Sequence, residues 1–258
     1  MQLTQTQEAN NMSDVLIQTS PMHECEEINL SKNESKVIYQ DFETPINCMN
    51  ISLEENASLE ILLYNSNITL NANLQRNAIL KIYNLAFSAE DYKCNIEVNL
   101  NDEASNVNII NVYLGINDAN LESNIQMNHY AKHSISMLDT YAIGKNNAKL
   151  NLNNNAFIKQ GMSQSDAKQS TRGLNLSSTS SIKAQPNLFI DEYDVIASHS
   201  CSIGSIDKDE LFYLMSRGLP EEQAHEIVVL GFIQPIIEKI KNEELQENIY
   251  KKFANLLK

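Results

Sequence analysis

Residues 56–61 read N-A-S-L-E-I, and residues 77–82 read N-A-I-L-K-I. The same form returns as D-A-N-L at residues 118–121 and as N-A-K-L-N-L at residues 147–152. Each copy has a turn-forming Asn or Asp, then Ala, then apolar and polar residues in alternation. Because a period of two places the apolar side chains on one face, these stretches predict short β-strands that each begin just after a turn.

The repeat is irregular in length. Its alanines, Ala57, Ala78, Ala119 and Ala148, are 21, 41 and 29 residues apart. The chain has only seven Gly and five Pro, too few for many two-residue hairpins. Stacked coils of uneven length fit these features better than a hairpin sandwich does. We therefore predict a mainly β fold: a right-handed parallel β-helix (a solenoid) over residues 21–206 with a C-terminal α-helical subdomain at residues 207–258.

Asparagine is abundant, with 34 residues, of which 31 precede residue 200. One interpretation is that Asn ladders stack at the corners of a parallel solenoid, where Asn tolerates a left-handed backbone and its amides bond to one another. The other interpretation is a compositional bias of the genome. The sequence leaves both open.

The C-terminal part changes to a helical pattern. Asp207 is placed to cap a first helix and Gly218 to end it. Pro220 and the two glutamates after it open a second helix. Apolar residues at helical spacing indicate a third helix: Leu245, Ile249, Phe253 and Leu256. We expect these helices to cover one end of the coil, and the polar, poorly patterned residues 1–20 to form a flexible N-terminal arm.

Composition excludes several classes of function. The net charge of −14 argues against a nucleic-acid partner. No window of about 18 uncharged apolar residues is present, which argues against a transmembrane helix. The N-terminus lacks a basic region followed by an apolar run, so no secretory signal is indicated, and the four cysteines form no close C-x-x-C pair. We expect reduced thiols and a cytoplasmic protein. No nucleotide-binding motif of the P-loop or G-x-G-x-x-G type is present.

Residues 194–218 carry the densest cluster of reactive groups, at the junction between strand and helix. The sequence predicts a last strand around Val195 and Ile196, followed at once by His199 and Cys201. Imidazole and thiolate are both iron ligands, and residues i and i+2 of an extended segment share a face. The structural alternatives are a histidine that caps the turn and a buried thiol that packs as a small apolar group.

His129 and His133 are spaced as two ligands on a helix would be, but their context is strand-like. In a strand they would lie about 13 Å apart, too far to bind one ion. We interpret both as residues of the β-helix.

The junction resembles the C-terminal signature of the SufB/SufD family, the scaffold subunits of the SUF system for iron–sulfur cluster assembly. The resemblance extends over about residues 129–235. At the junction it is carried by Ser198, His199, Ser202, Gly204, Ile206, Asp207, Asp209, Leu211, Phe212, Tyr213, Leu214, Ser216, Arg217 and Gly218. It implies the same parallel β-helix and a non-catalytic scaffold on which a transient iron–sulfur cluster of iron and sulfide is built.

The resemblance also implies roles for particular residues. His199 lies where the SufD-type histidine is implicated in cluster assembly. Cys201 departs from the family, which usually has a small residue there. Thr171 lies where SufB-type subunits have their principal cysteine, which favours a SufD-like role. The family's helical region docks a SufC-type ATPase, so the matching surface here would be formed by residues of the helical tail: Phe212, Tyr213, Arg217 and Phe232.

Two functional alternatives remain at this level. Within the family, the chain pairs either with a SufB-type subunit or with itself, through the last strands of the β-helix; the second arrangement is a homodimeric minimal scaffold that replaces both subunits. In another class, a polysaccharide-acting β-helix enzyme would line a groove with paired acids or basic residues. The N-terminus without a signal and the helical tail count against this enzyme.

Overall fold

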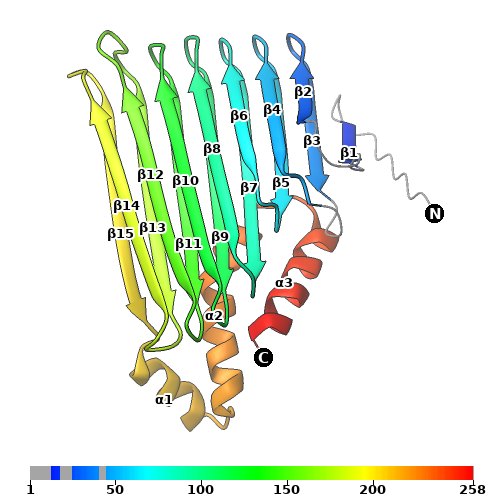
Figure 1. The fold of residues 1–258 in the computed structure, drawn as a ribbon, viewed down its shortest axis with the longest axis vertical. Coiled ribbons are helices and arrows are strands. Elements are labelled where there is room, and N and C mark those ends of the chain that lie inside the picture. Colours follow the sequence, from blue (N-terminus) through cyan, green and yellow to red (C-terminus); the bar gives the residue numbers. More distant parts are fainter. Residues whose placement is uncertain (1–12, 18–24, 41–44, 258) are drawn as a thin grey trace.

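The computed structural model describes residues 13–17, 25–40 and 45–257, and the predicted fold class is confirmed. All pairings between the strands are parallel, and the strands form two sheets. The chain alternates between the sheets, so each coil contributes one strand to each sheet, and the coils stack from the N-terminal to the C-terminal side (Figure 1). Leu, Ile, Val and Ala side chains fill the space between the two sheets.

The eight-stranded sheet holds the odd-numbered strands, in the order β1 (Ser13–Ile17), β3 (Ser35–Gln40), β5 (Ser58–Tyr64), β7 (Ile79–Ser88), β9 (Asn106–Gly115), β11 (Ile135–Gly144), β13 (Asp166–Asn175) and β15 (Ile196–Ser205). The seven-stranded sheet holds the even-numbered strands, β2 (Glu26–Leu30), β4 (Cys48–Leu53), β6 (Thr69–Leu74), β8 (Tyr92–Leu100), β10 (Asn120–His129), β12 (Lys149–Ile158) and β14 (Ser181–Ile190). Both sheets therefore end on the same side of the molecule, with β14 and β15.

The turns explain the asparagines. Asn33, Asn56 and Asn77 all have positive φ, at 63°, 59° and 56°. The Nδ2 of Asn56 donates to Oδ1 of Asn33 at 2.9 Å, and the Nδ2 of Asn77 donates to Oδ1 of Asn56 at 3.0 Å. The alanine that follows the turn in each repeat is buried, as at Ala57 and Ala78. The ladder interpretation is thus confirmed at these turns, because Asn adopts the left-handed backbone more readily than most residues.

The expected flexible arm is corrected in part. Ser13–Ile17 forms β1, which pairs in parallel with β3 at the edge of the sheet. The remaining parts of the arm, residues 1–12 and 18–20, lie outside the described residues. The stretch S-D-V-L-I is short and has no alternation of apolar and polar residues, so it does not predict a strand without the neighbouring β3.

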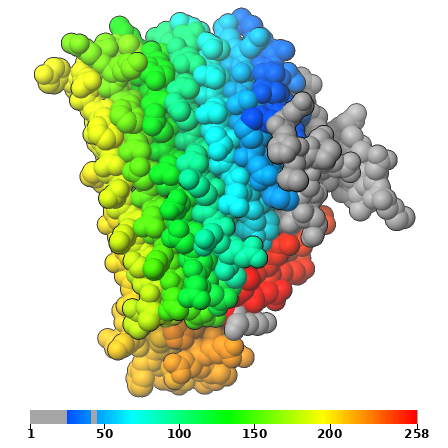
Figure 2. Space-filling model, viewed as in Figure 1, coloured from blue at the N-terminus to red at the C-terminus, as the bar shows by residue number. Residues whose placement is uncertain are grey.

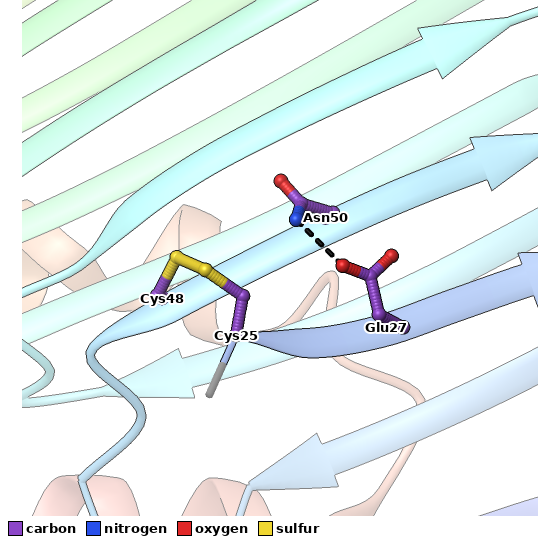
Figure 3. The surroundings of a disulfide bond; sticks show 4 residues. All are labelled: Cys25, Glu27, Cys48 and Asn50. Carbon is purple, nitrogen blue, oxygen red and sulfur yellow. Dashed lines mark hydrogen bonds between the residues drawn. A yellow bond between two sulfur atoms is a disulfide. The ribbon is translucent and has the colours of Figure 1, made fainter. Parts of the chain in front are cut away.

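The prediction that the cysteines are reduced is wrong for one pair. Cys25 and Cys48 form a disulfide that joins the start of β2 to the first residue of β4 (Figure 3). Beside it, Nδ2 of Asn50 donates to Oε1 of Glu27 at 2.7 Å between the same two strands. The sequence separation of 23 residues equals one coil, so stacking brings the two cysteines together. Cys94 and Cys201 are free thiols.

Loss of this disulfide is expected to destabilise the N-terminal coils by about 3 kcal/mol, the amount typical for a closed loop of this length. The test is urea unfolding of the oxidised protein, with and without reductant, and of the double variant Cys25→Ser/Cys48→Ser. Reductant should lower the midpoint of the wild type but not that of the double variant. An unchanged wild-type midpoint would show that the bond adds no stability.

The three predicted helices are present as α1 (Lys208–Ser216), α2 (Glu221–Ile237) and α3 (Glu243–Leu257). The carboxylate of Asp207 accepts a hydrogen bond from the backbone N–H of Asp209, and Gly218, with φ of 95°, follows the end of α1 as predicted. No helix of the described chain has the length and apolar character that a membrane crossing requires.

From the sequence we expected the helices to cover one end of the coil, but they do not. Instead, α2 and α3 pack on the outer face of the odd-numbered sheet (Figure 1). The Tyr83 hydroxyl on β7 donates to the carbonyl of Lys239 at 2.7 Å, and the rings of Phe87 and Phe253 meet edge to face at 5.1 Å. The odd-numbered strands β5, β7 and β9 bury large apolar residues on both faces, so their outer face needs a cover, whereas the exposed edge strand β15 does not.

His129 lies inside the β-helix, as predicted, but His133 does not lie in a strand. The ring of His129 is held by Ser134 Oγ at 2.7 Å from Nδ1 and by Ser136 Oγ at 2.8 Å from Nε2. His133 has φ of 56° and takes the turn position that Asn occupies in the earlier coils. The two histidines therefore belong to different environments and form no common site.

Acidification is expected to destabilise the protein through His129. Burial lowers its pKa to about 4, with the carboxylate of Asp166 opposing the shift. Between pH 6.5 and 4 the unfolded imidazole binds a proton that the folded one does not, so stability is full above pH 6.5 and falls as the pH falls. The loss at pH 4.5 should be about 2–3 kcal/mol. His129→Asn, which cannot titrate, should show a shallower fall in urea midpoint between pH 7.5 and 4.5; parallel curves would contradict this assignment.

Candidate functional site at the open end of the β-helix

The last strand lies later in the chain than the sequence predicted. Strand β15 spans Ile196–Ser205, so His199 and Cys201 lie within it and not after it. They do not cap the turn, and Cys201 is not buried: both side chains are exposed. Among the described strands, β15 pairs only with β13, and it therefore forms the end of the sheet with a free outer edge.

Both side chains face the interior side of the coil. His199 is the register partner of Gln169 on β13, and Cys201 is the partner of Thr171. Gln169 and Thr171 are buried between the sheets, and directly paired residues of parallel strands point the same way. His199 and Cys201 are therefore about 7 Å apart along one face. They line the place where the interior of the β-helix meets solvent, here called the open end.

The opposite wall of the open end is apolar. On β14, the residues in register with the interior positions of β12 are Ile182, Ala184, Pro186, Leu188 and Ile190. Ala184 and Leu188 pack against the core as partly buried side chains. Figure 2 shows the side of the molecule formed by these last coils, in yellow, opposite the N-terminal side. The imidazole and the thiol are thus the reactive groups of an otherwise apolar rim.

A row of polar residues leads from the core to Cys201. The positions paired across β7, β9, β11, β13 and β15 are Asn84, Asn111, Thr140, Thr171 and Cys201. Asn84 Nδ2 donates to Asn111 Oδ1 at 3.3 Å, and Asn111 Nδ2 donates to Thr140 Oγ1 at 3.1 Å. The first four members are buried, and only Cys201 reaches solvent.

The inner part of this row surrounds the free thiol of Cys94. Asn84 Nδ2 lies 3.3 Å from its Sγ, and burial raises the pKa of this thiol to about 11. The Tyr92 and Tyr113 hydroxyls bond to Asn84 at 3.0 Å each. Cys94 is consequently protonated near neutral pH and is inert as a nucleophile, and it is a reduced thiol as predicted.

Two buried acceptors one strand inside the open end have no donor among the residues that the structure describes. Asn154 on β12 uses Nδ2 to donate to Thr171 Oγ1 at 3.3 Å, and Gln169 uses Nε2 to donate to the carbonyl of Asn187 at 3.3 Å. Their side-chain oxygens are buried and unpartnered. Neither residue was predicted from the sequence, because the polar runs N-N-N at 153–155 and Q-S-T at 169–171 give no alternation that would mark which side chains point inward.

The residues expected to bind the ATPase are not all together. Phe212 and Tyr213 on α1 are 72% and 57% exposed, and α1 has no buried residue. Arg217 stacks on Tyr213, with its guanidinium carbon 5.2 Å from the ring centroid. Phe232 on α2 is half-buried and packs on Tyr141 with the ring centroids 5.3 Å apart.

A groove of about 720 Å³ lies between α1 and the sheet. It runs between the outer face of β13 and β15 and the two helices α1 and α2. Its lining includes Arg172, Ser202, Asp207, Glu210 and Phe232. The exposed side chains of α1 are therefore accessible from solvent.

In the described part of the chain, no three His, Cys, Asp or Glu side chains lie close enough together to hold a metal ion. At the open end this chain offers two potential ligands, one imidazole and one thiol, which is short of the four that an iron–sulfur cluster takes. The remaining ligands of such a site would have to come from outside the part of the chain that the structure describes.

The fold and the open end define a parallel β-helix protein that ends in an edge strand with exposed imidazole and thiol groups and carries a helical tail on its outer face. The family model described as "SUF system FeS cluster assembly, SufBD core domain" matches residues 4–232. The chain therefore belongs to the SufBD family of the SUF system for iron–sulfur cluster assembly.

Individual relatives agree. The chain is 36% identical over 124 residues to the iron–sulfur cluster assembly protein SufD of Bacillus subtilis, a match that covers 48% of this chain and 28% of the relative. It is 32% identical over 103 residues to the chloroplastic protein ABCI7 of Arabidopsis thaliana, covering 40% of this chain and 22% of that protein. The matched segments thus span about a quarter of the length of these relatives.

Proposed function

We propose that this chain is a non-catalytic scaffold subunit on which an iron–sulfur cluster is assembled at the open end of the β-helix. The observation that carries the proposal is the placement of His199 and Cys201, both exposed and on one face of a free edge strand. Iron and sulfide are the substrates of this assembly. Membership in the SufBD family and similarity to proteins named SufD support the same role.

The site needs a second subunit. Two ligands from this chain are too few for a cluster, and the free edge of β15 carries unpaired backbone groups that a further strand can bond. Pairing through the last strands would bring a second set of ligands to the open end. The partner is a SufB-type subunit or a second copy of this chain; Thr171, at the position of the SufB-type cysteine, favours the former.

The helical tail is proposed to bind a SufC-type ATPase. Closure of two ATPases on nucleotide binding would move the paired scaffolds and open His199 and Cys201 to iron and sulfide. The chain itself binds no nucleotide in this scheme. The setting is cytoplasmic, where Cys25 and Cys48 would meet a reducing thiol pool; alkylation of a fresh extract followed by mass spectrometry reports their state there.

The test is anaerobic co-purification with a SufC-type ATPase, followed by reconstitution with Fe²⁺ and sulfide. The proposal expects a stable complex that acquires the visible absorption of an iron–sulfur cluster, with iron and sulfide in stoichiometric amounts. A complex that forms but takes up no more iron than the ATPase alone would overturn the scaffold role.

A further inference from the structure

Gln169, whose side-chain oxygen has no hydrogen-bond partner, is paired in register with His199. Gln169 is 3% exposed and sits on β13, in direct register with His199 on β15. Its interior orientation follows from its own register partner Leu138, which belongs to the core. Adjacent strands lie about 4.8 Å apart, so the two side chains run side by side toward the open end.

The orientation of the Gln169 amide is set by its other bond. Nε2 donates to the main-chain carbonyl of Asn187 on β14, at 3.3 Å, which assigns the remaining atom Oε1 as an acceptor. That Oε1 is buried and accepts from no donor. A buried acceptor without a partner costs about 1–3 kcal/mol, so a donor within reach of it will form the bond.

We propose that Gln169 is a positioning residue for His199. The bond between them is not formed in the structure; when the exposed imidazole turns its N–H toward Oε1, the bond fixes the ring and leaves the other ring nitrogen as a lone pair directed into the open end. An imidazole that binds a metal through one nitrogen normally donates its other N–H to an oxygen of the protein. The role of His199 as a ligand rests on the proposed function, whereas the bond from Gln169 does not.

His129 shows why a histidine that binds a metal can have one ring nitrogen in a hydrogen bond to the protein but not both. Both nitrogens of that buried ring are held by serine hydroxyls, Ser134 and Ser136, so no lone pair is available. At His199, Gln169 offers a single acceptor to one ring nitrogen. The other ring nitrogen faces solvent and stays available to bind a metal. The thiol of Cys201 lies next to it on the same face.

The test observes the ring of His199 in the full-length protein without metal. In ¹⁵N-histidine-labelled protein at pH 8, the wild type should show a protected ring N–H cross-peak that is absent from His199→Ala. The cross-peak should be lost in Gln169→Leu and retained in Gln169→Glu, whose carboxylate still accepts. The bond to Asn187 is lost in both variants, so a purely structural role of Gln169 would make them behave alike. Gln185→Leu, an exposed glutamine of β14, is the matched control.

The outcome separates the two proposals. An unchanged His199 cross-peak in Gln169→Leu overturns the positioning role, whatever the protein does with iron. A lost cross-peak that returns in Gln169→Glu supports it, even if reconstitution shows that no cluster is built on this chain. Where a cluster is built, Gln169→Leu should lower iron uptake at limiting Fe²⁺ about 10–100-fold, the usual effect of removing an outer-shell partner, and Gln169→Glu should not.

Discussion

Replacing His199 with alanine is expected to lower cluster loading at least tenfold while the fold stays intact. Removal of an outer-shell partner alone costs about 10–100-fold in metal affinity, so removal of a ligand costs at least as much. The open end offers one imidazole and one thiol from this chain, and no third ligand is at hand among the described residues to replace the ring. The measurement is iron and sulfide bound per complex after anaerobic reconstitution.

The controls use the alternation of the same strand. Ser200 lies between the two candidate ligands and points to the other face of the sheet, so Ser200→Ala should load as the wild type does. If both residues are ligands, cluster loading should fall in Cys201→Ala as it does in His199→Ala. Because β15 is exposed, the free energy of unfolding of all three variants should stay within about 0.5 kcal/mol of the wild-type value. Equal loading of His199→Ala and wild type would remove His199 from the site.

The sequence predicted the β-helix because its signal is local. At Asn56-Ala57 and Asn77-Ala78 a left-handed turn residue, a buried small residue and a period-two strand follow one another within six positions. Each of these preferences can be assessed without knowing any partner strand. The cap at Asp207 and the stop at Gly218 are local in the same sense, and the structure confirms both.

The features that the sequence did not reveal depend on register between coils. Cys25 and Cys48 are 23 residues apart, the same separation as Asn33 and Asn56, whose amides are bonded to each other. The length of one coil would therefore have predicted the disulfide, had it been known in advance. The docking of the helices on the outer face depends on which strands are apolar on both sides, which alternation alone does not show.

The candidate site was predicted only in its exposed part. His199 and Cys201 are chemically distinctive residues in a recognisable motif. Gln169 and Asn154 are ordinary polar residues of strands, and their importance arises from burial without a full set of partners. That property depends on which face of β13 and β12 points inward, and so it appears only when the coils are stacked.

The largest effect on partner binding is expected from Phe212→Ala/Tyr213→Ala, which should weaken binding of the SufC-type ATPase about 100-fold or more. Exposed aromatic side chains that become buried in an interface contribute about 2 kcal/mol or more each, and 1.4 kcal/mol is tenfold in affinity. Met215 on α1 and Ile227 on α2 are also exposed large apolar residues. Alanine preserves the helix. The measurement is calorimetric titration of the purified ATPase into the variant.

In the proposed function, these helices would link ATPase binding to the open end. α2 is fixed to the odd-numbered sheet through Phe232, whose ring packs on Tyr141 of β11, and α1 follows directly from β15. A force on α1 therefore acts on the strand that carries His199. The double variant should lose the ATP-dependent part of cluster loading and keep the loading seen without nucleotide. The control Ile79→Ala, at an exposed apolar site on the distant β7, should leave both kinds of loading unchanged. ATPase binding of wild-type strength in the double variant would place the docking surface elsewhere.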